Sequence, residues 1–81
     1  MIVRVRLGLL LAPISARPPL TLALPDRATI SDLCERVAME NPEHARGLAS
    51  ATAFVNAEQV GRAHALRDGD EITLMLPMVG G

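Results

Sequence analysis

Aromatic residues and cysteine are almost absent from this sequence of 81 residues, which has one Phe, one Cys and neither Trp nor Tyr. The single cysteine, Cys34, cannot form an internal disulfide, and two scattered histidines cannot complete a metal cluster with it. Phe54 is the one aromatic ring on which a nucleic-acid base could stack. The composition therefore argues against metal, redox and nucleic-acid functions.

Lysine is absent as well, so all eight basic residues are Arg, and nine acidic residues bring the formal net charge to −1. Non-specific nucleic-acid binding needs a basic face, so we expect no nucleic-acid partner. The apolar run from Leu7 to Ile14 is broken by Gly8 and Pro13 and falls short of the ~20 residues of a membrane span. We expect a cytoplasmic protein with no membrane partner, whose first strand begins at the start codon.

Alternation of apolar and polar residues predicts strands over about residues 2–11, 19–25, 53–55 and 71–76, with a stub near residue 60. Thr29 can cap a helix that ends near residue 40, since Pro42 disfavours helical geometry at the residue before it. A single helical turn after Pro42 would end at Gly47. Turns are predicted at 56–59 and 68–70.

The helix has one apolar stripe that must be buried: Ile30, Leu33, Cys34, Val37 and Ala38. The strands offer one face rich in leucine and valine, so sheet and helix should form a two-layer α+β fold. The element order is that of a β-grasp, in which the first and last strands lie parallel at the sheet centre. We expect a mixed sheet of four to five strands packed on one main helix over residues 1–76, followed by a flexible C-terminal tail at 77–81.

Side chains that could perform catalysis are few. Cys34 lies within the apolar stripe, and no His or Asp stands at a spacing that would build a triad with it. We interpret it as a small buried hydrophobe, and His44 and His64 as solvated residues. Asp68 and Asp70 fit ordinary turn chemistry, so we predict no metal site.

The last two residues, Gly80 and Gly81, have no structural use, because terminal glycines pack against nothing. Without side chains they can enter a narrow channel and present the terminal carboxylate to another protein. Pro77 to Gly81 spans at most ~16–18 Å when extended. A carboxylate becomes an electrophile only after activation, for example by adenylation. This interpretation makes the chain a carrier whose partners stabilise the transition states.

The tail occurs together with Asp68-Gly69-Asp70-Glu71-Ile72, Pro77 and the segment Val79-Gly80-Gly81. This combination resembles the ubiquitin-like sulfur-carrier family, in particular the small subunit of molybdopterin synthase, with the thiamine-pathway carrier ThiS as a relative. The resemblance implies that an E1-like adenylating enzyme uses ATP to activate the Gly81 carboxylate, which then becomes a thiocarboxylate. The large synthase subunit would supply the catalytic side chains and pass the sulfur to a pyranopterin precursor. This chain itself would bind no cofactor.

The same resemblance places the tail residues Pro77, Met78 and Val79 in the partner's channel, although family tails usually have a small residue where Val79 stands. Alternation also places Phe54 and Met75 on the side of the sheet away from the helix, where they would form an apolar patch for docking. The alternative is that these two side chains are covered within the monomer or point singly at solvent.

Two other functions stay open. The chain could carry sulfur for thiamine or another pathway or modify proteins, although conjugated modifiers usually have a basic residue where Val79 stands. It could also be a non-covalent β-grasp interaction module for which the glycines are incidental.

Overall fold

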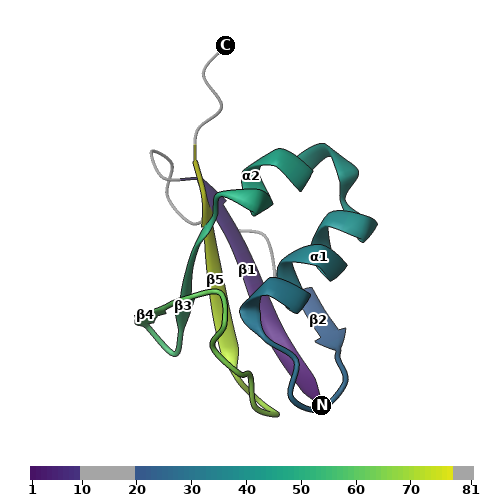
Figure 1. Ribbon diagram of the computed structural model, residues 1–81, viewed down its shortest axis with the longest axis vertical. Coiled ribbons are helices and arrows are strands. Elements are labelled where there is room, and N and C mark those ends of the chain that lie inside the picture. The colour runs from purple at the N-terminus through teal and green to yellow at the C-terminus, as the bar shows by residue number, and fades with distance from the viewer. Residues whose placement is uncertain (10–19, 78–81) are drawn as a thin grey trace.

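The computed structural model describes residues 1–9 and 20–77, and in this part of the chain the helices cover one face of a sheet (Figure 1). The elements in chain order are β1 (Ile2–Leu9), β2 (Leu20–Ala23), α1 (Ile30–Glu40), the 3-10 helix η1 (Pro42–His44), α2 (Ala45–Ala49), β3 (Thr52–Val55), β4 (Glu58–Val60) and β5 (Glu71–Leu76). None of the helices in the described part is long and apolar enough to cross a membrane.

The sheet is mixed, and its strand order is β2-β1-β5-β3-β4. β1 and β5 lie parallel at its centre, while β2 pairs antiparallel with β1. On the other side β3 pairs antiparallel with both β5 and β4. Five strands with α1 packed against them make a ubiquitin-like β-grasp, so the predicted fold class is confirmed.

The core lies between the sheet and the helices. Its largest fully buried side chains come from alternate positions of β1 and β5, from the apolar stripe of α1 and from α2: Val3, Val5, Ile30, Leu33, Val37, Leu48, Ile72 and Leu74. Burying one aliphatic side chain of this size contributes about 1.5–3 kcal/mol. Because every second residue of β1 and β5 is apolar, burying these residues determines which face of the two central strands packs against the helices.

α1 begins and ends where local sequence signals predicted. The Thr29 hydroxyl accepts a hydrogen bond from the Asp32 amide (3.3 Å), and Asp32 Oδ2 accepts one from the Thr29 amide (2.9 Å), which completes a capping box. At the other end, the amide and side-chain nitrogens of Asn41 both donate to the Val37 carbonyl. Pro42 follows at once and cannot continue the hydrogen-bond ladder.

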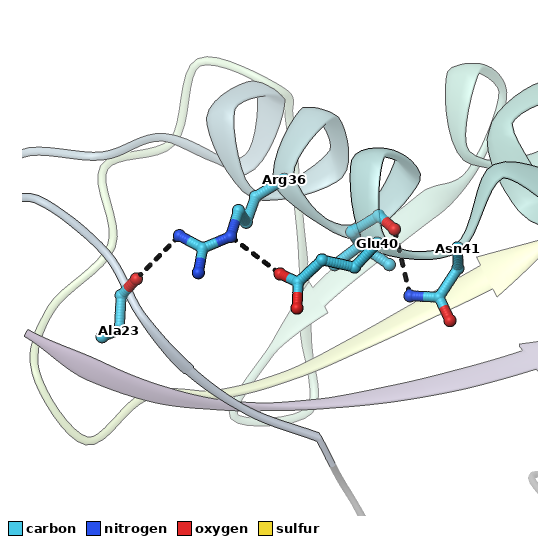
Figure 2. Close-up of polar contacts among 5 residues, drawn as sticks. Ala23, Arg36, Glu40 and Asn41 are labelled. Carbon is cyan, nitrogen blue, oxygen red and sulfur yellow. Dashed lines mark hydrogen bonds and ion pairs between the residues drawn. The ribbon is translucent and has the colours of Figure 1, made fainter.

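Arg36 connects α1 to the edge strand β2. Its guanidinium donates to the Ala23 carbonyl (3.2 Å) and to Glu40 Oε2 (2.7 Å), as Figure 2 shows. Leu24, which the prediction included in the strand, lies beyond β2 but still donates its amide to the Met1 carbonyl (2.9 Å). Pro25 has no amide to donate, which explains why pairing ends before residue 25.

Two local predictions were wrong. Gly47 does not end a helical turn but is buried within α2, where an added Cβ would lie 2.8 Å from Leu76 Cδ2, so glycine allows α2 to approach β5. The predicted turn at 56–59 is shorter, because Glu58 and Gln59 belong to β4. Asn56 and Ala57 alone make the turn, with φ of 49° and 72°.

Candidate functional site

The strand that leads to the C-terminus is held at the centre of the sheet. β5 is bordered by β1 and β3, and its last residue, Leu76, is buried and pairs with Leu9. Pro77 follows, partly buried, at the end of the ladder. The tail therefore starts from a fixed position, beside the ends of the two central strands (Figure 1).

The predicted reactive group lies outside the described residues, as do Gly80 and Gly81 themselves and the predicted contacts Met78 and Val79. Their roles stay predictions. In the part of the chain that the structure describes, no three His, Cys, Asp or Glu side chains are grouped to hold a metal.

Phe54 and Met75 lie on the outer face of the sheet, opposite the helices, as the alternation predicted. Phe54 is opposite Thr73, and Met75 is opposite Thr52, so the two apolar side chains are diagonal neighbours on adjacent strands. Both are partly buried, and neither is enclosed in the core. The outer face thus presents an accessible apolar pair on β3 and on the strand that leads to the tail.

A shallow groove of about 460 Å³ lies beside this pair on the outer face. The residues that line it come from β1, from β5 and from the β3–β4 turn: Arg4, Arg6, Asn56, Ala57, Glu71, Ile72 and Thr73. Arg4 Nη1 lies 3.7 Å from Glu71 Oε1, and both side chains are more than half exposed. Alternation along residues 2–11 can place Arg4 and Arg6 on the polar side of a strand, but nothing local indicates which residues of β5 stand opposite them.

Two turns fix the start of β5 beside the groove. Asn56 donates its amide to the Glu71 carbonyl (2.8 Å) and accepts the Glu71 amide on its side-chain oxygen (3.2 Å). Asp70 Oδ2 accepts the Arg67 amide (2.9 Å), and Asp68 Oδ1 accepts the Ile2 amide (2.6 Å). The Asp70 carboxylate is therefore engaged within the turn, as predicted, whereas the Asp68 carboxylate ties the turn to the first residue of β1.

Cys34 lies in the core, and burial raises the pKa of its thiol above the ordinary value of 9.0, although the nearby Arg62 guanidinium opposes the rise. A thiol with a raised pKa is neutral at pH 7 and is a poor nucleophile. His64 is exposed, and His44, partly buried, has Nε2 3.9 Å from Glu43 Oε1. These residues do not converge on a site, so among the described residues the outer face and the root of the tail remain the candidate functional region.

Comparison with known proteins identifies the family. The family model described as the ThiS family matches residues 11–81, which is most of the chain. The chain belongs to the ThiS family. This confirms the predicted resemblance to ubiquitin-like sulfur carriers. No curated protein matches this ThiS-family chain.

Solved structures share the fold of this ThiS-family chain at low sequence identity. SAMP1 from Haloferax volcanii superposes with a TM-score of 0.75 at 20% identity, with each chain covered completely. A putative molybdopterin converting factor subunit 1 from Pyrococcus furiosus gives 0.74 at 20% identity, with 95% of this chain and 98% of that chain covered. A complex of subunits 1 and 2 of molybdopterin-converting factor from Helicobacter pylori contains a chain that gives 0.65 at 23% identity, again with complete coverage of both.

Proposed function

We propose that this chain is the sulfur-carrier small subunit of molybdopterin synthase and acts in molybdenum cofactor biosynthesis. The observation that carries the proposal is that β5, fixed at the centre of a β-grasp sheet, continues through Pro77 into a sequence that ends in Gly80-Gly81. Membership of the ThiS family and the fold shared with two molybdopterin converting factor subunits support it.

The proposed chemistry uses the terminal carboxylate of Gly81. A carboxylate oxygen attacks the α-phosphorus of ATP on an E1-like adenylating enzyme, and pyrophosphate leaves. A donor persulfide then attacks the acyl carbon, and AMP leaves to give an acyl disulfide. A thiol attacks the donor sulfur of that disulfide, so that the thiocarboxylate leaves and a new disulfide stays on the donor. Inside the large subunit of the synthase, the thiocarboxylate sulfur passes to the pyranopterin precursor, and water restores the carboxylate.

In this proposal the folded domain supplies binding while its partners supply catalysis. Gly80 and Gly81 place no side chain in the partner's channel, so the backbone can pass close to the activating centre. Pro77, Met78 and Val79 contact the walls of that channel. Phe54 and Met75, partly buried on the outer face, dock on the partner's surface, because aromatic and Met side chains are favoured at interface cores.

Genetic complementation tests the molybdopterin assignment. We expect the chain to restore molybdenum-enzyme activity in a strain that lacks its own small synthase subunit, and a variant without Gly81 to fail although it folds equally well. A strain that lacks its thiamine sulfur carrier is the matched control. Rescue of the thiamine strain alone would move the function to that pathway, and rescue by the variant without Gly81 would contradict the carrier mechanism.

A second candidate function is protein modification, favoured by the match to SAMP1, a small archaeal modifier protein. In that case the adenylated Gly81 carboxyl would be transferred to an amine of a target protein to form an amide bond, with release of AMP. Covalent conjugates that require Gly81 and are visible on a denaturing gel would support this function. Their absence, together with a thiocarboxylate at Gly81, would favour sulfur transfer alone.

A further inference from the structure

The strand β2 forms one edge of the sheet, and its register shows which of its backbone groups face outward. The Met1 nitrogen donates to the Leu24 carbonyl and the Leu24 amide donates to the Met1 carbonyl, both at 2.9 Å, so these two residues form a hydrogen-bonded pair. Hydrogen-bonded and non-hydrogen-bonded pairs alternate along antiparallel strands. Thr21 and Ala23 therefore belong to the non-hydrogen-bonded pairs, and their amide and carbonyl groups point away from β1 at the open edge.

β2 has no charged side chain of its own. Natural edge strands often include charged residues, which prevent pairing with the edge of another chain. The opposite edge strand, β4, includes Glu58, whereas β2 has the sequence Leu-Thr-Leu-Ala, and Leu20 is 39% exposed. Within residues 1–9 and 20–77, the one charged side chain that donates a hydrogen bond to this strand comes from the helix α1, and it is that of Arg36.

The guanidinium of Arg36 lies at the open edge itself. Its Nη1 donates to the Ala23 carbonyl (3.2 Å), and its Nε donates to Glu40 Oε2 (2.7 Å), which keeps the side chain oriented (Figure 2). The Ala23 carbonyl is one of the groups that an added strand would use. Such a strand would bring its own amide to the same oxygen, and it would either displace the guanidinium or bury its charge, which is costly without a partner.

We propose that Arg36 prevents β2 from pairing with β2 of a second copy of this chain, and that the edge becomes a dimer interface when this contact is lost. Antiparallel pairing about a two-fold axis at Leu22 places Thr21 opposite Ala23 of the second copy. These are the residues whose backbone groups face outward, so each such pair can exchange both of its hydrogen bonds. The same register places the exposed Leu20 opposite Leu24 of the second copy.

The chemistry of the edge favours a second copy as its partner. Pro19 and Pro25 flank β2 in the sequence and have no amide to donate, so the edge accepts only a short strand. β2 of a second copy has the same 4 residues, and it includes no carboxylate that would neutralise an enclosed guanidinium. Arg36 therefore opposes this pairing specifically. The inference goes beyond the proposed carrier function and does not depend on it.

The test is the molar mass of Arg36→Ala and of the unaltered chain, measured by sedimentation equilibrium over a range of protein concentrations. We expect the unaltered chain to be monomeric. Arg36→Ala should dimerise with an association constant at least about tenfold above any that the unaltered chain shows, because each copy loses a charge-assisted hydrogen bond that opposed pairing. Arg36→Lys should stay monomeric, since lysine also keeps a charge at the edge. Alanine favours the helix, and thermal melting checks that the fold is kept.

Arg46→Ala is the matched control, because Arg46 is exposed on α2 and the substitution removes the same charge. The double variant Arg36→Ala with Thr21→Pro locates the contact. Proline removes the Thr21 amide, which faces outward and is not used by β1, so the double variant should be monomeric again.

A monomeric Arg36→Ala would overturn the inference, because the edge would then need no such protection. A dimer that survives Thr21→Pro would also overturn it, since the interface would lie elsewhere. Equal dimerisation of Arg46→Ala would show that the lost charge, and not the edge, is responsible. None of these outcomes changes the result of the complementation test, so the inference and the proposed function can fail separately.

Discussion

At the scale of single residues, one residue of the β3–β4 turn, Ala57, has a backbone conformation that is unfavourable for a residue with a side chain. Ala57 has φ of 72°, in the left-handed region, and Asn56 before it has φ of 49°. A two-residue hairpin turn with both residues in this region favours Asn followed by Gly. Asn tolerates the conformation, whereas the Cβ of Ala57 crowds the next carbonyl oxygen at a cost of about 1 kcal/mol. The turn that borders the outer-face groove is therefore strained at one position.

Replacing Ala57 with Gly should raise the free energy of unfolding by up to about 1 kcal/mol, because glycine adopts this φ without steric cost. Urea denaturation of the two proteins measures the change. The matched control is Ala38→Gly within α1, where glycine should lower stability by about 1 kcal/mol. Destabilisation by Ala57→Gly would contradict the assignment of strain to this turn.

Because of Cys34, the free energy of unfolding should decrease at alkaline pH. The pKa of its thiol is raised above 9.0 in the folded state by burial, so the unfolded chain loses this proton first as pH rises. The contribution to stability is complete below pH 9.0, the ordinary value, and decreases as pH rises above it. The sequence has no Lys and no Tyr, so few other groups titrate in this range.

We expect the free energy of unfolding to decrease as pH rises above 9.0, and Cys34→Ala to remove most of that decrease. Denaturant unfolding at several pH values measures both slopes. Cys34→Ala should also retain adenylation by the activating enzyme, since the thiol is buried away from the outer face. An unchanged slope in Cys34→Ala would show that another group controls alkaline stability.

At the scale of elements, residues close to its ends predict where α1 begins and ends. The role of Gly47 could not be predicted in this way, because it depends on a contact between distant parts of the chain. The capping box at Thr29 and Asp32 and the stop at Pro42 all lie within a few residues of the helix ends, so the sequence specifies them directly. Local sequence predicts that Gly47 ends a helical turn, because glycine often follows the last residue of a helix. Its actual role depends on Leu76, which is distant in sequence and reaches it only through the packing of α2 on β5.

Gly47→Ala should lower the free energy of unfolding by about 1–3 kcal/mol, because the added Cβ would lie 2.8 Å from Leu76 Cδ2 and 3.2 Å from Leu76 Cγ. Chemical denaturation measures the loss. Gly61→Ala is the matched control, since nothing lies within 4 Å of its added Cβ, and it should be neutral or slightly stabilising. If both substitutions behaved alike, close packing of α2 on β5 would not explain the glycine.

At the scale of the whole molecule, the alignment of the strands determines which side chains lie next to one another on the outer face. The sequence alone does not predict this alignment. Alternation correctly placed Phe54 and Met75 on the outer face, because it needs only the period of each strand. The groove and the pairing of Arg4 with Glu71 require the alignment of β1 with β5, which are at opposite ends of the chain. The described fold thus places charged side chains beside Phe54 and Met75 on the outer face, and β5 continues from there towards the tail.

The most direct test of the carrier account is the intact mass of the chain purified from cells grown with ample sulfur. We predict a species in which one oxygen of the Gly81 carboxyl is replaced by sulfur, and fragmentation should place the change on the last residue. A chain with one residue appended after Gly81 should lack this species. A chain that never carries sulfur at Gly81 when its activating enzyme and sulfur donor are present would contradict the account.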